Sequence, residues 1–188
     1  TIQAQQRWTT YTGVENVNMA TWKTRYCLPR SCTEDTKLQE FQFKVNHNVV
    51  TTNNLLCKIG LSDTSNCSYC NQHKETIHHL LAECEMTRPL WAGVRHWLNN
   101  IYDIHLDLTT EMIVFGSKHV DLFINFVLLV TRYEIYRNKF SGTTPQVYGV
   151  IQRIARYYET ELFNANINNR RSKFFKKWCK VNDFFKST

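Results

Sequence analysis

The chain has 188 residues, of which 43% are hydrophobic and 13% aromatic, and it carries a net charge of +7. This hydrophobic content excludes a disordered chain, and no apolar run is long enough to cross a bilayer, so we expect a soluble globular protein without a membrane span. The excess of positive charge favours polyanionic partners.

The N-terminal part is predicted to contain a linker and three helices. Residues 1–21 are polar and lack a sustained hydrophobic period, so we expect a linker from an upstream region. A short helix from Trp22 should end before Pro29, because proline disfavours helical backbone at the preceding residue. Apolar residues at helical spacing predict two further helices, over 33–45 and 52–60, and we expect these two to form a helical hairpin.

Four potential metal ligands follow this hairpin. Cys67 and Cys70 form a Cys-x-x-Cys pair, and His79 and Cys84 form a His-x4-Cys pair in sequence that is expected to be helical. Three thiolates and one imidazole are the ligands that tetrahedral zinc prefers. Because four protein ligands leave no open coordination position, the pattern predicts a structural Zn²⁺ site.

Alternatives to this ligand set stay open. His78, or His73 three residues after Cys70, could supply the imidazole in place of His79. The cysteines could also be buried apolar residues that bind no metal, although such residues have no need of the Cys-x-x-Cys spacing. The other cysteines show no disulfide framework, which favours a reducing compartment, and they are Cys27, Cys32, Cys57 and Cys179.

The remaining sequence predicts helices that are separated by short turns. Thr87 and Pro89 begin a strongly amphipathic helix, on which Trp91 either packs under the metal-binding loop or stacks on a base. Further helices are expected over 110–115, over 118–139, from Pro145 to Ala165 and from Phe174 to Phe185. We therefore predict a mainly α fold, a helical bundle with a CCHC zinc-knuckle-like loop inserted between helices. Residues 22–105 would hold the hairpin and zinc module, and residues 106–188 a basic helical bundle packed on it.

Positive charge gathers toward the C-terminus. From Arg132 to the end there are twelve Lys or Arg residues and four acidic ones. Four lysines recur at three- and four-residue steps, so they should share one helix face that can bind phosphates, or else a face that is merely solvated. The candidate nucleic-acid contacts are Arg170, Arg171, Lys173, Lys176, Lys177 and Lys180 in this run, Arg132, Arg137, Lys139, Arg153 and Arg156 on the preceding helices, and Lys58, Lys74 and Arg88 beside the metal ligands. The aromatic residues that would either stack on bases or fill the core are Tyr69, Tyr133 and Tyr136.

The sequence lacks the motifs of an enzyme. A polymerase needs two aspartates close together to hold its metal ions, and this chain has no adjacent Asp pair. It has no glycine-rich phosphate loop and no nucleophile motif. A zinc hydrolase would require that one of the four predicted ligands be wrong. We therefore expect this segment to act by binding and not by catalysis.

Several segments resemble the zinc-binding region near the C-terminal end of non-LTR (LINE-type) retrotransposon reverse-transcriptase polyproteins. The resemblance extends over about residues 22–130 and is carried by Lys37–His47, Thr52–Leu56, Lys58–Gly60, the pair Cys67 and Cys70, Glu75–Leu81, Cys84, and Leu90 with Trp91. It implies a region beyond the polymerase domain of an RNA-directed DNA polymerase, needed for retrotransposition and implicated in binding nucleic acid.

From this resemblance we expect a module that holds the RNA template, the target DNA or both during target-primed reverse transcription. Its other partner would be the polymerase core of the same polyprotein, within a nuclear and cytoplasmic ribonucleoprotein. The alternative is a structural module that docks on and positions the polymerase core without contacting nucleic acid.

Overall fold

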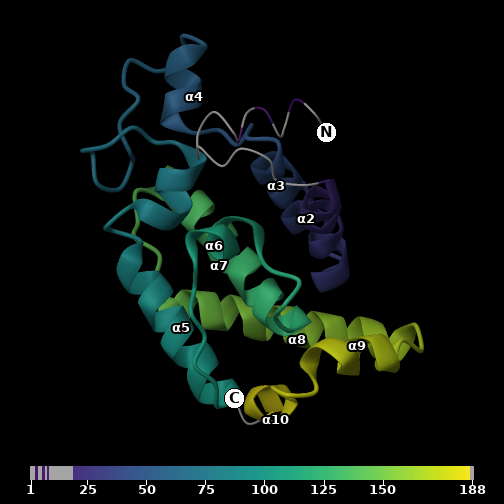
Figure 1. Cartoon of the computed structure of the whole chain (residues 1–188). Coiled ribbons are helices and arrows are strands. Elements are labelled where there is room, and N and C mark those ends of the chain that lie inside the picture. Colours follow the sequence, from purple (N-terminus) through teal and green to yellow (C-terminus); the bar gives the residue numbers. More distant parts are fainter. Residues whose placement is uncertain (1–2, 4–5, 7, 9–18, 187–188) are drawn as a thin grey trace.

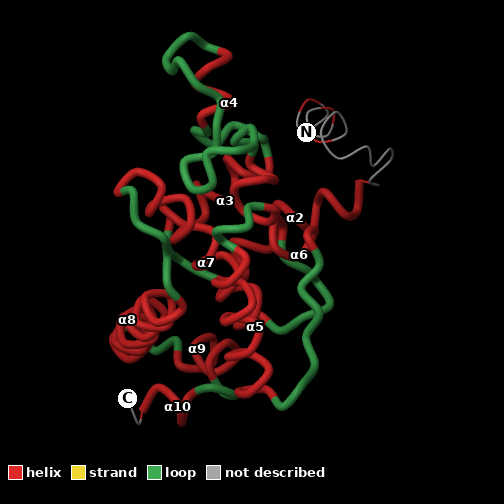
Figure 2. Tube along the Cα trace, turned by 90° about the vertical axis from the view of Figure 1, so that its left-hand side faces the viewer, coloured by secondary structure: helices red, strands yellow, loops and turns green. Residues whose placement is uncertain are grey.

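The computed structural model describes residues 3, 6, 8 and 19–186, and every regular element in this part is a helix (Figures 1 and 2). The elements are α2 (Met19–Cys32), α3 (Thr36–Asn46), α4 (Asn53–Lys58), the π-helical turn η1 (His79–Glu83), α5 (Arg88–Tyr102), α6 (Thr110–Phe115), α7 (Leu122–Ser141), α8 (Val147–Ile167), α9 (Arg171–Trp178) and α10 (Asn182–Lys186). The prediction of a mainly α fold is confirmed. Among the described residues, no helix is long and apolar enough to span a membrane.

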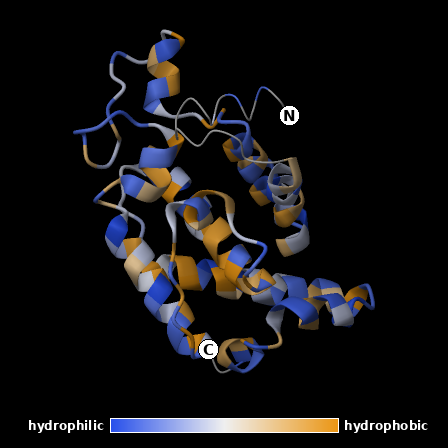
Figure 3. Ribbon diagram, viewed as in Figure 1, coloured by the Kyte–Doolittle hydropathy of each residue, from blue (hydrophilic) through white to orange (hydrophobic). Residues whose placement is uncertain are grey.

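The central element is α7, which contacts α2, α3, η1, α6, α8 and α9. All residues from 123 to 130 are buried, so this stretch is the fully buried helix that its hydrophobicity predicts. Figure 3 shows it as a largely hydrophobic ribbon between helices of mixed character. The helix begins at Leu122 and not at Lys118, because the Asp121 carboxylate caps it by accepting a hydrogen bond from the Phe123 N–H at 2.9 Å.

Helix α2 continues through Pro29 to Cys32, so the predicted stop before Pro29 is wrong. A proline has no N–H, which leaves the carbonyl four residues earlier, that of Arg25, without its helical partner. The buried side chain of Asn46 on α3 donates to this carbonyl at 2.9 Å. The hydrogen bond lost within α2 is therefore replaced by one from the neighbouring helix.

Part of the expected N-terminal linker belongs to the folded body. Trp8 is 3% exposed, its indole N–H donates to the carbonyl of Asn46 at 3.0 Å, and its ring meets Phe115 edge-on with centroids 4.9 Å apart. Residues 19–21 form the first turn of α2. The rest of residues 1–21, apart from positions 3 and 6, lies outside the described residues.

The predicted hairpin of α3 and α4 does not form as a packed pair. Thr52 caps α4, but none of the α4 side chains is buried, and the helix stands away from the bundle at the top of Figure 1. Ile59 and Leu61, just beyond it, are 58% and 72% exposed. We conclude that polar contacts at its first residues, and not an apolar face, hold α4 in place.

The C-terminal helices cover the first turns of α7. The predicted final helix is divided into α9 and α10, yet the four apolar residues that recur along it at steps of three and four are all buried, namely Phe174, Trp178, Val181 and Phe185. The ring of Trp178 is fully buried and meets Phe123 and Phe126 of α7 at centroid distances of 5.2 and 5.6 Å. One hydrophobic core thus runs from Trp8 to Phe185.

Gly93→Ala tests the close approach of α5 and α8. A Cβ added at Gly93 would lie 2.3 Å from Cγ2 of Val147, so the two helices would have to move apart. We expect this overpacking to lower the free energy of unfolding in urea by about 1–3 kcal/mol at saturating zinc. Gly149→Ala is the matched control, because nothing lies within 4 Å of its added Cβ, and it should be neutral or slightly stabilising. Equal stability of the two variants would contradict this packing.

Candidate metal centre

The first two ligands lie in a loop between α4 and η1, here called the zinc loop (residues 61–76). The Cys67 N–H donates to the carbonyl of His73 at 2.7 Å, and the Asn71 N–H donates to the carbonyl of Cys67 at 2.9 Å. Asn71 has a φ of 54°, a left-handed conformation that asparagine tolerates better than most residues. This tight reversal turns the thiol of Cys70 back toward that of Cys67.

The other two ligands lie at the two ends of η1. The Cys84 N–H donates to the carbonyl of His79 at 2.8 Å, a five-residue step that defines a π-helical turn. In an α-helix, side chains five residues apart point roughly 140° away from each other. The wider π turn brings His79 and Cys84 to the same side. Thr76 caps this segment, as its hydroxyl accepts from the His79 N–H at 3.0 Å.

The four ligand atoms lie within 4.8 Å of one another. The sulfurs of Cys67 and Cys84 are 3.8 Å apart, and the sulfur of Cys70 is 3.4 Å from Nε2 of His79. A tetrahedron with Zn–S bonds of about 2.3 Å has an S···S edge of about 3.8 Å, so this spacing fits zinc without rearrangement. The structure therefore brings together all four predicted ligands.

The alternative histidines are not part of this cluster. Nδ1 of His78 lies 3.1 Å from a carboxylate oxygen of Glu83, on the outer side of the turn. His73 is exposed, and its ring centroid is 5.3 Å from that of His79. The imidazole ligand is thus His79, which is buried.

The surroundings of Cys67, Cys84 and His79 favour the neutral form of each side chain, whereas those of Cys70 favour the thiolate. Burial raises the pKa of the Cys67 thiol to about 12 and also raises the pKa of Cys84. Burial would raise the pKa of Cys70 too, but hydrogen bonds from the backbone N–H groups of Gln72 and His73 outweigh it and lower the pKa. Burial lowers the pKa of His79, which keeps a lone pair available on the ring. A bound cation would supply the charge that stabilises the thiolates.

A buried ion pair joins the zinc loop to the central helix. Glu75 of the loop is completely buried, and its carboxylate pairs with the ammonium group of Lys139 on α7. The same carboxylate accepts hydrogen bonds from the N–H of Ser68 at 2.7 Å and from the N–H of Asn53, the first residue of α4, at 2.8 Å. The Lys139 ammonium also donates to the carbonyl of Thr51 at 3.1 Å. One pair therefore holds the loop, α4 and α7 together.

Two aromatic side chains add further contacts. Tyr69, between the two loop cysteines, donates its hydroxyl to the carbonyl of Ile135 on α7 at 2.6 Å. Trp91 is 5% exposed, and its indole N–H donates to the carbonyl of Leu81 in η1 at 2.7 Å. Both residues are thus packing residues. The sequence placed Trp91 under the loop as one of two alternatives. Glu75 begins one of the segments that carry the resemblance, but nothing in its spacing indicated a buried ion pair.

The predicted phosphate-binding residues are only partly on the surface. Arg132, Lys139 and Lys177 are buried, so their prediction as nucleic-acid contacts is wrong. Arg132 donates to the carbonyl of Ile113 at 2.9 Å and so caps the end of α6. Lys177 pairs with Glu161 at 2.6 Å and lies over the ring of Phe126. The spacing of the four lysines was expected to place them on one exposed helix face, but one of them, Lys177, lies in the interior.

The other candidates are exposed or half-buried and differ in their partners. Arg137 and Arg153 both pair with Glu134, Arg170 and Lys173 both pair with Glu34, and Lys180 pairs with Asp121. Arg171 donates to the Asn166 side chain at 2.9 Å. Lys58 is exposed at the end of α4. Among the described residues no acidic partner is found for Lys74, Arg88, Arg156, Arg171 or Lys176, and all five are exposed.

Cys84→Ser should abolish stoichiometric zinc binding, because it removes one of four ligands. Zinc contributes roughly 10–16 kcal/mol of apparent binding free energy in comparable sites, so the zinc loop and η1 should become unprotected in hydrogen exchange. The interior of α7 should remain protected by its own packing. Cys57→Ser, at an exposed cysteine outside the cluster, is the control. Metal analysis that finds one zinc per chain in Cys84→Ser would contradict the ligand assignment.

Glu75→Gln should destabilise the protein by about 3–5 kcal/mol, because it leaves the buried Lys139 without its counter-charge. Burial opposes ionisation of Glu75, but hydrogen bonds from Lys139, Ser68 and Asn53 outweigh it, so the pKa of Glu75 is lowered. Its contribution is therefore complete above the ordinary glutamate pKa of about 4.3 and is lost as the pH falls through the lowered value.

Unfolding in urea at several pH values measures this effect. Glu40→Gln, which breaks the exposed pair with Lys44, is the control and should have little effect on stability, because solvent screens this pair. If both substitutions have the same small effect at neutral pH, the ion pair of Glu75 is not the anchor of the zinc loop.

The comparisons with known proteins agree with the donor set and the geometry. No curated protein and no solved structure matches the chain. Residues 6–91, which include all four ligands, match the profile of the zf-RVT family, described as zinc-binding in reverse transcriptase. The matched segment is therefore similar to a zinc-binding domain that is associated with reverse transcriptases, and its Cys67, Cys70, His79 and Cys84 cluster suits the zinc ion that such a domain binds.

Proposed function

We propose that this chain is a zinc-stabilised nucleic-acid-binding module of a LINE-type reverse transcriptase. It holds the RNA template, the target DNA or both during target-primed reverse transcription, and it works beside the polymerase core of the same polyprotein. The family match supports the association with reverse transcriptase. The basic surface around α9 supports binding to nucleic acid.

The observation that carries this proposal is the charge around α9. Five exposed cations lie on or beside this helix, and they are Arg170, Arg171, Lys173, Lys176 and Lys180. Arg170 and Lys173 share the single carboxylate of Glu34, and among the described residues only Lys180 has an acid of its own. Such a surplus attracts phosphates and releases their counterions, which gives a salt slope of about −4.5 for duplex if all five take part.

The module binds and does not catalyse. Its four protein ligands fill the coordination sphere of a tetrahedral zinc, as in structural sites. The four cysteines outside the metal centre are not joined in disulfides, and three of them, Cys27, Cys57 and Cys179, are exposed, which supports a reducing compartment such as the nucleus or cytoplasm.

A second candidate function is docking on the polymerase core, and the observation that favours it lies at α4. This helix stands away from the bundle, its side chains are half-buried or exposed, and Ile59 and Leu61 beyond it are mostly exposed. Exposed apolar residues of this kind are suited to a protein partner. In this case the basic surface would have no direct role.

Replacement of Arg171 and Lys176 by alanine separates the two functions. The double variant should bind duplex DNA and structured RNA more weakly, and its salt slope should be smaller by about 1.8, or 0.9 for each lost phosphate contact. Fluorescence anisotropy at several salt concentrations measures both quantities.

The double variant Lys23→Ala with Arg95→Ala is the control, because it removes the same charge from exposed positions on α2 and α5. Equal affinities and slopes for the two double variants would remove the α9 surface from the proposal. Failure of the unaltered protein to bind any nucleic acid at low salt would leave docking as the function.

A further inference from the structure

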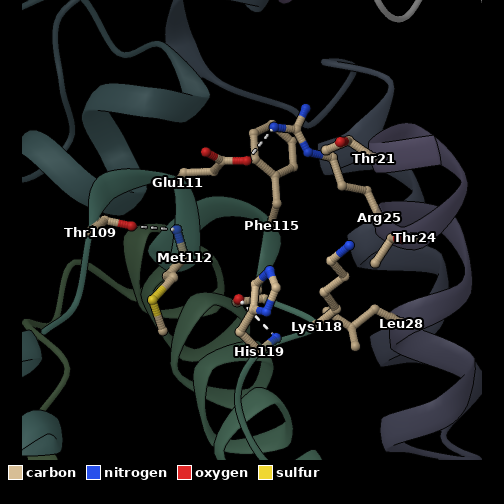
Figure 4. A pocket seen from close by; sticks show the side chains of 12 residues that line it. Thr21, Thr24, Arg25, Leu28, Thr109, Glu111, Met112, Phe115, Lys118 and His119 are labelled. Carbon is tan, nitrogen blue, oxygen red and sulfur yellow. Dashed lines mark hydrogen bonds and ion pairs between the residues drawn. The ribbon is translucent and has the colours of Figure 1, made fainter. Parts of the chain in front are cut away.

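A cleft of about 440 Å³ lies between α2 and the segment that contains α6 and its following loop (Figure 4). One face of α2 lines it, since Thr21, Thr24, Arg25 and Leu28 recur at helical spacing. The opposite wall is formed by residues 109–119. The volume is in the range of small-ligand sites, which is about 300–1,000 Å³, and suits a single nucleotide. None of the four zinc ligands and none of the α9 cations lines this cleft.

The wall after α6 is fixed in position. Gly116 has a φ of 77°, and a Cβ there would lie 2.6 Å from Oδ1 of Asn125 and 2.7 Å from Cδ2 of Leu28. The buried Asn125 side chain accepts from the Ser117 N–H at 2.9 Å and donates to the Ser117 carbonyl at 2.8 Å. The cleft is thus held open by hydrogen bonds and close packing, so it is formed before any ligand arrives.

Arg25 is the built-in charge of the cleft. It is 7% exposed, and its guanidinium lies 3.9 Å from the ring centroid of Phe115 and 4.6 Å from that of Trp22. One terminal nitrogen donates to Glu111 at 2.8 Å, whereas the buried Nε has no hydrogen-bond partner among the described residues. A buried donor without a partner indicates a place where an acceptor is missing.

The mouth of the cleft offers further donors. Lys118 and His119 are exposed, and Figure 4 shows both side chains below that of Glu111. Among the described residues neither side chain has an ionic partner. Arg25 and Lys118 are positively charged and Glu111 is negatively charged, so these three residues give the cleft one net positive charge. This balance suits the single negative charge of a phosphodiester better than the several charges of a nucleoside triphosphate.

The rest of the lining suits a base. Leu28 and Met112 provide apolar surface, and the exposed Glu111 keeps one carboxylate oxygen without a partner among the described residues. A carboxylate can accept a hydrogen bond from the amino group of a base such as cytosine. Only a base that is unpaired and turned out of its strand can enter a pocket of this kind.

We propose that this cleft binds one unpaired nucleotide of a nucleic-acid strand. Lys118 and Arg25 face its phosphate, and Glu111, Met112 and Leu28 face its base. The inference rests on the proposed function and adds to it a site for single-stranded sequence that is separate from α9.

The test compares Lys118→Ala with Lys23→Ala, which removes the same charge from an exposed position on α2 that does not line the cleft. Affinities for a short single-stranded cytidine oligonucleotide and for a duplex are measured at several salt concentrations. We expect Lys118→Ala to weaken single-strand binding by about tenfold, as for the loss of a charged hydrogen bond, and to lower the salt slope by about 0.7. Duplex binding and the melting temperature should not change, and Lys23→Ala should resemble the unaltered protein.

A second measurement locates the strand directly. An oligonucleotide with one photoreactive 4-thiouracil should cross-link within residues 109–119 and should lose this cross-link in Lys118→Ala.

Two results would overturn only this inference, provided that the unaltered protein binds the strand. Lys118→Ala could bind the strand as tightly as Lys23→Ala does, or it could weaken duplex binding as much as single-strand binding. In either case the cleft is not the site. If cytidine monophosphate binds as tightly as the strand, the ligand is a free nucleotide and the inference is again overturned. If the unaltered protein binds neither strand nor duplex, the proposed function fails as well.

Discussion

The buried ion pair of Glu75 and Lys139 is the contact on which the position of the metal centre depends. A bound zinc would tie the loop to η1, which packs on α6 and α7, and the ion pair ties the loop to α7 directly. The pair does so because the carboxylate also receives the N–H groups of Ser68 and Asn53, and the ammonium group also reaches the carbonyl of Thr51. Two charges in the interior are costly unless all their hydrogen-bonding positions are used, and here most of them are. The result is a metal centre that is rigidly attached to α7.

Much of the fold could be predicted from the sequence because hydrophobic spacing dictates which helix faces are buried. The core stretch of α7 and the inner face of α9 and α10 are examples, and both were correctly placed. The errors arose where a tertiary contact outweighed a local rule. Pro29 does not end α2, because Asn46 on another helix replaces the missing hydrogen bond. The sequence around Pro29 does not reveal that Asn46 will donate this hydrogen bond.

The metal ligands were predictable for a different reason. Three cysteines and a histidine with this spacing seldom occur outside metal sites, and their ligand types are those that tetrahedral zinc prefers. The choice of His79 over His78 needed the π-helical turn, which spacing alone does not reveal. It was harder to predict which basic residues are exposed, because a lysine or arginine carries the same charge whether it faces water or a buried carboxylate.

For Lys177 a signal was nevertheless present. Phe174, Trp178 and Val181 occupy steps of four and three along one helix face, and Lys177 lies on the same face. Its burial beside Glu161 follows from this register. Arg132 and Lys139 carry the same signal, because they share a helix face with the buried Leu128 and Ile135 at steps of four and three. Their partners, the carbonyl groups at the end of α6 and a loop carboxylate, could not be named from the spacing.

The π turn between His79 and Cys84 also constrains how this segment can change in length. A π turn is an α turn that has accommodated one additional residue. Deleting one residue would restore regular α geometry and leave the imidazole and the thiol four residues apart, about 40° from each other around the helix axis and so still on one face. Adding one residue in regular α geometry would set them about 120° apart and turn the thiol away from the other sulfurs. The π turn therefore lets a five-residue interval present both ligands to one ion, as a four-residue interval would in a regular α-helix.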